Sequence, residues 1–331
     1  MHETYMPVNW QPQYPAWEPY WENKSEPLVA GYFGIQAEQP QLLDEWASQS
    51  LYGAHAPLAV EQGLHVDGDR ARDFVYLAYW RQSEYRRWWA LADNSGWWGD
   101  DERLTEGVGY WREIISMPFD RFETLHLSKQ LQGVSVSAQG LHGPIREHGY
   151  PGSIRDRIPI SESHSLRRVT GIQTPLPSRT TAAGNRVTVT PYQNTCAIRI
   201  GLDWSACGNK EKTFYRGRIF PRLLEGMKAI GDNPAETGCY SLRYVDEMDG
   251  AWGASEKGFV LGYAVDVRAY EGWANTHSTH RALLARYREL HDTFGADSGI
   301  ALWHEVTALP NKGCEFEYIG CRPGTGLLGY T

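Results

Sequence analysis

The sequence predicts an α+β fold, in which two antiparallel sheets face each other and carry helices on their outer faces. The first observation behind this prediction is an internal repeat. FVYLAYW (74–80) is similar to FVLGYAV (259–265), and WREI (111–114) is similar to WHEV (303–306). The second observation is the composition, 41% hydrophobic and 22% charged, which is typical of a folded globular chain. A β-α-β-β unit that occurs twice favours two packed sheets that close a barrel-like core.

The repeat continues in the same order on both sides of these segments. FETL (122–125) and FEYI (316–319) follow as the last strand of each half. GYFGIQ (31–36) and GCYSLRY (238–244) are expected as opening strands, and a helix is expected at about 40–50 after the first of them. Each match is short, so the argument depends on their shared order.

Three regions are expected along the chain. Residues 1–27 contain NWQPQYPAWEPYW, where prolines and aromatic residues predict an irregular arm laid over the body. The body, 28–331, is expected to be one domain made of two halves, about 28–130 and 236–331, with an insertion at about 131–235. The insertion contains a Gly/Arg-rich loop, a strand candidate and a helix candidate: EHGYPGSIRDRIP, RVTVTPYQNTCAIRIGL and FPRLLEGMKAIG.

Composition and charge exclude several classes of protein. The net charge is −8 and no basic stripe occurs, so nucleic acid is not an expected partner. We expect no membrane span, because no apolar run reaches the required length, and the N-terminal residues lack the apolar core of a secretory signal. The five cysteines form no C-x-x-C motif, which indicates reduced thiols in a cytoplasmic protein.

Two histidines are specific to the second half. His280 aligns with Ser95 and His304 aligns with Arg112, whereas Glu123 has a counterpart in Glu317. Residues needed only for folding should match more often across the two halves. The difference therefore marks His280 and His304 as candidate functional residues.

His280 lies in NTHSTHRALLARYREL, where Asn275 or Ser278 could cap a helix. His277 and His280 would share one helix face and could clamp a metal, but no third ligand is evident. A single imidazole on a helix instead suits haem iron, since the porphyrin supplies the equatorial ligands. The plain alternative is a pair of exposed histidines at a helix start.

His304 lies in IALWHEV, where alternation places Trp303 and Glu305 on one face and His304 with Leu302 and Val306 on the other. An imidazole at such a position can transfer protons near neutral pH. The alternative is a core histidine bonded to a backbone carbonyl.

Arg155 and Arg157 lie in GSIRDRIPIS, a loop shaped by Gly and Pro. An arginine there could hold a carboxylate such as Glu123 or a porphyrin propionate. The alternative is a surface ion pair with Asp156, which would contribute little.

Taken together, these segments resemble the haem-containing aldoxime dehydratases. The similar stretches run from about residue 30 to the C-terminus: GYWREI, FETL, EHGYPGSIRDRIPIS, AIRIGLDW, GCYSLRY, THSTH, HEV and FEYIGCRPGTGLL. The resemblance implies a duplicated ferredoxin-like (dimeric α+β barrel-type) fold, a homodimer, and haem b that is active as ferrous iron. It also implies dehydration of an aldoxime, R–CH=N–OH, to a nitrile.

Residue roles follow from the same resemblance. It implies that His280 is the axial iron ligand and that His304 is the distal acid–base group. Arg157 and Glu123 are implied to support His304. The family pattern has a serine that hydrogen-bonds the oxime hydroxyl, where this chain has Ile200 in AIRIGLDW. Isoleucine cannot form that bond.

Three functions therefore remain open from the sequence. The first is dehydration of an aldoxime to a nitrile by a haem lyase. The second is a haem enzyme of the same fold acting on a different N–O substrate, by N–O cleavage with rearrangement or by N–N bond formation. The third is a haem carrier or sensor without turnover, against which the set of His304, Glu123 and Arg157 argues.

Overall fold

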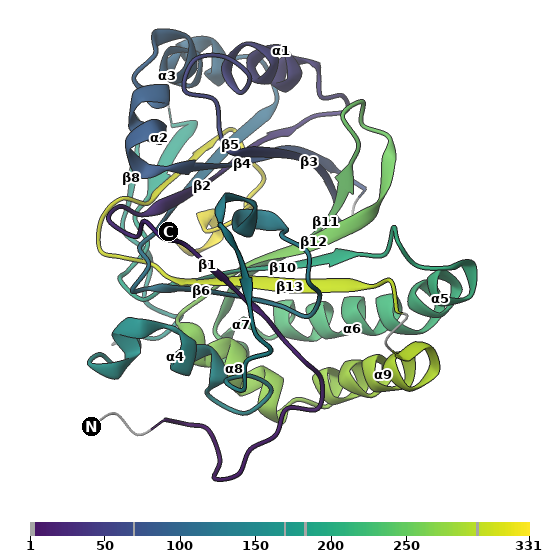
Figure 1. Ribbon diagram of the computed structural model, residues 1–331. Coiled ribbons are helices and arrows are strands. Elements are labelled where there is room, and N and C mark those ends of the chain that lie inside the picture. Colours follow the sequence, from purple (N-terminus) through teal and green to yellow (C-terminus); the bar gives the residue numbers. More distant parts are fainter. Residues whose placement is uncertain (1–3, 69, 169, 182–183, 296–297) are drawn as a thin grey trace.

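The computed structural model describes residues 4–68, 70–168, 170–181, 184–295 and 298–331. Twelve of the described strands form one continuous antiparallel sheet, in the order β6-β13-β10-β12-β11-β3-β4-β2-β5-β14-β9-β8. The sheet bends around a central core, so its two halves face each other, with α1–α3 outside one half and α5, α6, α8 and α9 outside the other (Figure 1). The predicted α+β class, with helices on the outer faces of antiparallel strands, is confirmed.

The first half of the chain alternates strands with helices. Its elements are β2 (Leu28–Gln36), α1 (Gln41–Ser50), β3 (Ala59–Val66), β4 (Arg72–Arg81), α2 (Gln82–Trp89), α3 (Ala92–Gly99), the short η1 (Asp101–Leu104), β5 (Gly109–Met117) and β6 (Phe122–His126).

The second half repeats this order. Its elements are β10 (Cys196–Asp203), α5 (Asn209–Phe214), the π-helical turn η4 (Tyr215–Ile219), α6 (Phe220–Gly231), α7 (Pro234–Thr237), β11 (Cys239–Met248), β12 (Ala254–Ala264), α8 (Val267–Thr276), α9 (Ser278–Phe294), β13 (Ala301–Ala308) and β14 (Glu315–Ile319). A short final turn, η6 (Leu328–Tyr330), follows.

The strand order shows which elements are equivalent. β2 lies between β4 and β5, and β10 lies between β12 and β13. The counterpart of β2 is therefore β10 rather than β11, whose place corresponds to that of the additional strand β3. This differs from the sequence comparison, which paired GYFGIQ with GCYSLRY and began the second half near residue 236. The two β-rich segments look alike because both carry Gly and Tyr beside apolar residues.

The last strands are exchanged between the halves. β6 pairs with β13 of the second half, and β14 pairs with β5 of the first half. This exchange brings FETL of the first half beside WHEV of the second, so residues far apart in the sequence share one surface.

The middle segment contains η2 (Gly133–Ser137), β7 (Gly140–His142), α4 (Ser153–Arg157), η3 (Pro159–Glu162), β8 (Ser178–Thr180) and β9 (Arg186–Val189). The strand expected over 186–202 is two strands. β9 pairs with β14, whereas β10 pairs with β12 and β13. The strand conformation is interrupted between β9 and β10. Pro191 has no N–H for a strand ladder, and Asn194 has a left-handed φ of 69°.

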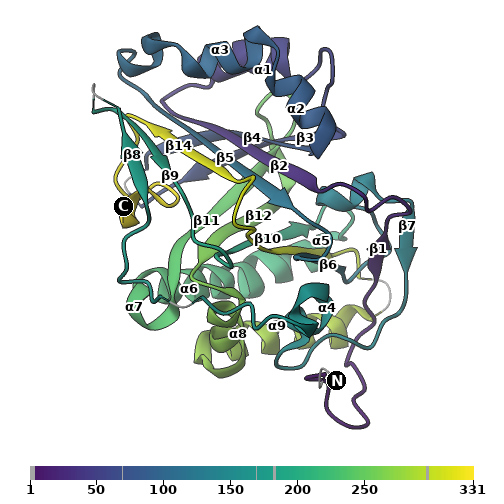
Figure 2. The same ribbon diagram turned by 90° about the vertical axis from the view of Figure 1, so that its left-hand side faces the viewer.

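The N-terminal arm runs across the second half, as expected for an arm that covers the body (Figures 1 and 2). Apart from β1 (Glu18–Tyr20), its described residues have no regular helix or strand. Residues 1–3 of the predicted arm lie outside the described residues.

Apolar side chains form one core between the sheet halves and further clusters beneath the helices. The cluster under α1–α3 is rich in tryptophan, with Trp46, Trp88 and Trp98 packed around Phe33. Among the described residues, no helix is long and apolar enough to cross a membrane.

Candidate active site

His304 and Ile200 lie side by side on the helix-facing surface of the sheet. They are register partners across the antiparallel strands β13 and β10. Ile200 packs with the apolar cluster that includes Val267 and Tyr270 of α8, so this surface is the one that the helices cover. Trp303 and Glu305 are buried on the opposite surface, as the alternation predicted.

Glu123 joins His304 through the strand exchange. Its Oε1 lies 2.8 Å from Nε2 of His304, and its Oε2 accepts a hydrogen bond of 2.9 Å from Nε of Arg157. The side chains of Glu123 and Arg157 are 2% and 3% exposed, so water screens this ion pair little. The structure thus brings together three of the predicted site residues from three separate segments.

The cluster keeps Glu123 ionised. Burial alone raises the pKa of this carboxyl, but the charges of Arg157 and His304 outweigh it and lower the pKa to about 2. A carboxylate that stays charged can hold a proton on the neighbouring imidazole.

One nitrogen of His304 remains available. Nε2 lies 3.2 Å from Nη2 of Arg157 as well as 2.8 Å from Glu123, but a ring nitrogen that donates to the carboxylate cannot also accept from the guanidinium. With Nε2–H directed at Glu123, the proton that can be exchanged is on Nδ1. Among the described residues, Nδ1 of His304 makes no hydrogen bond. The ring is therefore oriented by one nitrogen and free to react at the other.

Arg157 is held by α4, whose other charged residues each have separate partners. Arg155 forms a buried ion pair of 2.7 Å with Glu271 of α8, which ties α4 to the helix layer. Asp156 accepts hydrogen bonds from Tyr150 and from Thr4 of the arm. Arg157 donates hydrogen bonds to Glu123 and to the backbone carbonyl of Glu147, and its side chain is buried, so it is not a surface residue.

His280 lies in the first turn of α9, within the helix layer that covers the sheet (Figure 1). Its ring packs against Trp273 of α8, with ring centroids 4.7 Å apart. His277 is not helical; it is the N-cap of α9, and its side chain accepts from the backbone N–H of Thr279. The expected caps Asn275 and Ser278 are therefore wrong, and the two histidines do not share a helix face. Among the described residues, no group of three potential ligands could hold a bare metal ion.

The surroundings of His280 fit an axial ligand. Its Nδ1 is buried and lacks a partner with full hydrogen-bond geometry among the described residues. Burial lowers the pKa of the imidazole, and the nearby backbone carbonyl of Ala274 offsets this only in part. A neutral imidazole can ligate a metal through a ring nitrogen.

Apolar clusters lie on both sides of the row formed by Ile200 and His304. One contains Ile198 and Val306, and the other contains Leu202 and Leu283 of α9. Apolar side chains, an imidazole on a helix and a second imidazole on the sheet fit a bound haem.

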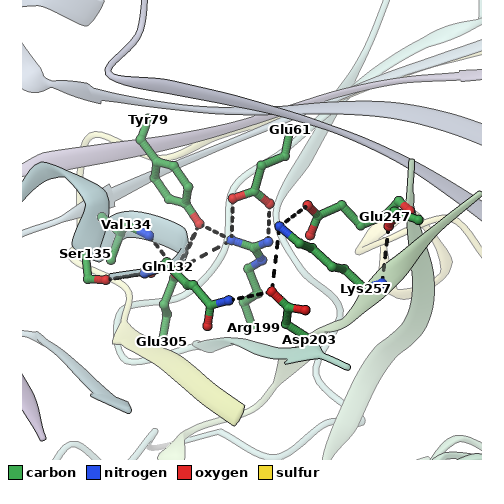
Figure 3. A network of polar contacts seen from close by, with 11 residues as sticks. Glu61, Tyr79, Gln132, Val134, Ser135, Arg199, Asp203, Glu247, Lys257 and Glu305 are labelled. Carbon is green, nitrogen blue, oxygen red and sulfur yellow. Dashed lines mark hydrogen bonds and ion pairs between the residues drawn. The ribbon is translucent and has the colours of Figure 1, made fainter. Parts of the chain in front are cut away.

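A second polar network supports the same strands from the barrel side (Figure 3). Arg199 pairs in register with Glu305, next to the pair of Ile200 and His304. Tyr79 donates to Glu305 at 2.9 Å and accepts from Arg199 at 2.6 Å, while Glu61 forms an ion pair with Arg199. Burial raises the pKa of Glu305, and the charge of Arg199 opposes that effect. These contacts fix β10 and β13 relative to each other.

The antiparallel barrel carries the buried cluster of His304, Glu123 and Arg157 on one surface of its sheet, and the helices that cover this surface carry His280. The family model of the haem-containing dehydratases matches residues 31–327. The chain belongs to the haem-containing dehydratase family, and it is a haem-dependent lyase. The resemblance inferred from the sequence is thus confirmed.

Individual relatives agree with this family. The chain is 33% identical to a phenylacetaldoxime dehydratase of Bacillus sp. (strain OxB-1), over 98% of this chain and 94% of the relative. It is 31% identical to an aliphatic aldoxime dehydratase of Pseudomonas chlororaphis, over 98% and 93% of the two chains. A crystal structure of an aldoxime dehydratase with butyraldoxime superimposes with a TM-score of 0.91 at 28% identity, over 99% of this chain and 92% of the other.

Sequence reasoning did not find Trp273 or Glu18, although both contact predicted site residues. Trp273 lies against the ring of His280, and Glu18 of the arm lies 3.9 Å from Nε of Arg157. The repeat aligns Trp273 with Trp88, and a position that matches across the halves is expected to serve folding. No pattern in the sequence connects Glu18 to a residue 139 positions away.

Proposed function

We propose that this protein dehydrates an aldoxime to a nitrile, with haem held by His280 and proton transfer by His304. The observation that carries the proposal is the buried contact of His304 with Glu123 and Arg157, which leaves Nδ1 of the ring free. When bound, ferrous haem supplies an iron that the oxime nitrogen can coordinate and electron density that weakens the N–O bond.

The protein's own residues then supply the protons. Protonated His304 gives one proton to the departing hydroxyl, so that water leaves instead of hydroxide. The neutral ring takes one proton from the oxime carbon as the C≡N bond forms. The two transfers cancel, and His304 ends the cycle in the state in which it began. Glu123 stabilises the imidazolium between cycles, and Arg157 keeps Glu123 in place and ionised.

A second candidate is a haem enzyme of the same family that acts on a different N–O substrate. Ile200, beside His304 on the sheet, favours it, because an apolar side chain cannot hydrogen-bond an oxime hydroxyl. The proposal of a carrier or sensor without turnover has less support, since such a protein has no need of a proton-transfer cluster.

The test is nitrile formation by the ferrous holoprotein on a panel of aliphatic and aromatic aldoximes. The haem-free chain and His304→Ala are the controls. Rapid nitrile formation that depends on both haem and His304 supports dehydration. If the holoprotein consumes a different N–O compound and forms no nitrile from the aldoximes, the second candidate is favoured. The homodimer and the cytoplasmic location stay predictions, and light scattering after gel filtration checks the former.

A further inference from the structure

The N-terminal arm is attached directly to the strand that carries Glu123. Trp17 exchanges backbone hydrogen bonds of 2.8 and 2.9 Å with His126, the last residue of β6. The next residue, Glu18, begins β1, which pairs antiparallel with β7 so that Glu18 lies opposite His142. Backbone pairing therefore fixes the position of Glu18 independently of its side chain.

The side chain of Glu18 extends toward the cluster formed by His304, Glu123 and Arg157. Its Oε1 lies 3.9 Å from Nε of Arg157, the same nitrogen that donates to Glu123 at 2.9 Å. Its Oε2 lies 3.5 Å from Nε2 of His142, whose side chain is 56% exposed. Glu18 itself is 27% exposed, whereas Arg157 is only 3% exposed. Two carboxylates thus share one buried guanidinium, and the outer one contacts the solvent side.

We propose that Glu18 is a further positioning residue of the active site, which shares Arg157 with Glu123 and so sets how firmly Glu123 holds the proton on His304. This inference rests on the proposed function, because it assumes that His304 transfers protons during turnover. The titratable groups that face Glu18 come from five segments: Arg157 of α4, Glu123 of β6, His142 of β7, Glu147 in the loop before α4, and Lys24 of the arm.

The charge of Glu18 changes in the neutral range. Burial raises the pKa of this carboxyl, Arg157 opposes the effect, and the charges of Glu123 and Glu147 add to it, giving about 7. Below that pH Glu18 is neutral and Arg157 neutralises Glu123 alone. Above it, ionised Glu18 competes for Arg157 and adds a negative charge, and both effects favour the imidazolium of His304. Ionised Glu18 therefore adds a negative charge beside the cluster of Arg157, Glu123 and His304.

The test is the pH dependence of turnover in Glu18→Gln, which removes the charge but preserves the backbone pairing of β1. We expect kcat to equal that of the wild type at acid pH. At alkaline pH the descending limb should move down by about half a pH unit, a loss of about threefold, because one nearby charge is missing. Glu22→Gln is the matched control, since Glu22 is an exposed carboxylate on the same arm. Glu18→Asp keeps the charge and should restore most of the alkaline limb.

A second readout does not depend on turnover. The C–O stretch of carbon monoxide bound to the ferrous holoenzyme responds to the protonation of a distal imidazole, so its pH midpoint should fall in Glu18→Gln but not in Glu22→Gln. An unchanged midpoint in Glu18→Gln, with normal haem content and melting temperature, would overturn the inference. A uniform loss at all pH values would assign Glu18 a purely structural role and also overturn it. If the wild type forms no carbon monoxide adduct, the haem assignment fails first.

Discussion

Ile200 lies directly opposite His304 across β10 and β13, and both side chains are on the helix-facing surface of the sheet. The side chain beside the proposed acid–base residue is therefore apolar. Next to this pair, Arg199 and Glu305 are opposite each other on the barrel surface. The same two strands thus carry a fixed ionic network on one surface and a reactive residue with an apolar neighbour on the other.

The first prediction concerns the helix histidines. We expect His280→Ala to lose the Soret band or most of its haem, because the imidazole proposed to ligate the iron is removed. His277→Ala should keep its haem and lose only about 1 kcal/mol of stability, since His277 caps α9. Haem content and thermal melting of both variants make the comparison. A normal ferrous spectrum in His280→Ala would rule out the assignment.

The second prediction separates catalysis from ligation at His304. The variant His304→Ala should bind haem normally and lose turnover by a factor of about 10² or more, the usual contribution of a general acid–base group. Haem titration and steady-state assays on the same preparation measure both quantities. Loss of haem binding would instead make His304 a ligand or a structural residue.

The third prediction is that Arg157 and Glu123 act as one unit. Because they share a buried ion pair, removing either one disrupts what the other does for His304. We expect the loss of kcat/KM in the double variant Arg157→Gln/Glu123→Gln to be smaller than the combined losses of the two single variants, with a coupling of about 0.5–3 kcal/mol. Additive losses would show that Arg157 acts elsewhere, for example on a propionate.

The fourth prediction concerns stability and His126, which is fully buried where the arm joins β6. Burial lowers the pKa of His126 to about 4, and the nearby charge of His304 adds to the effect. The pKa of His126 in the folded protein is thus below its ordinary value of about 6.5. Between pH 4 and pH 6.5 the unfolded chain therefore binds a proton at His126 that the folded protein does not. Stability from the neutral ring is thus present above pH 6.5 and is lost as the pH falls toward 4.

Urea unfolding at pH 7 and pH 5 tests this prediction. The free energy of unfolding should fall between pH 7 and pH 5 in both proteins. The fall should be smaller in His126→Phe than in the wild type, by about 2 kcal/mol. His291→Gln, at an exposed position on α9, is the control and should behave as the wild type. An equal pH dependence in His126→Phe and the wild type would show that other groups cause the acid instability.

The repeat explains how much of the site could be read from the sequence. In WREI and WHEV, Trp and Glu match, and Glu113 and Glu305 both face the barrel core, where each bonds a tyrosine hydroxyl. The residue between them differs, Arg112 in one half and His304 in the other, and it faces the helices. A position that matches across the halves serves the shared core, whereas one that differs serves a task of one half.

The first half carries different residues at the positions that correspond to His304 and Ile200. Arg112 is held by carboxylates of the exchanged strand, as His304 is held by Glu123. Phe33, the register partner of Arg112, is packed among indole rings where the second half has Ile200. The equivalent positions of the two halves therefore carry different chemistry.

Other features could not be read from local sequence. The start of the second half was missed because residues 186–202 look like one strand in the sequence. In the structure an irregular segment separates β9 from β10. The cap of α9 was missed because histidine is not among the preferred capping residues. Glu18 reaches Arg157 only through the pairing of β1 with β7, which depends on tertiary contacts.

The last prediction concerns Ile200, at the position where we expect the family pattern to have a serine. A hydroxyl at this position would donate a hydrogen bond to the departing oxygen, worth roughly 0.5–1.5 kcal/mol, or up to about tenfold in rate. We therefore expect Ile200→Ser to raise nitrile formation from small aldoximes. Ile200→Thr and Ile200→Val form a matched pair of nearly equal volume, so the hydroxyl alone should make the Thr variant faster than the Val variant. The measurement is kcat/KM of all four proteins on one aldoxime panel. A native substrate that packs against Ile200 predicts a different result, in which Ile200→Ser loses activity on that substrate while it gains activity on small aldoximes. Strong wild-type turnover that falls in both hydroxyl variants would show that the missing serine is irrelevant to this enzyme.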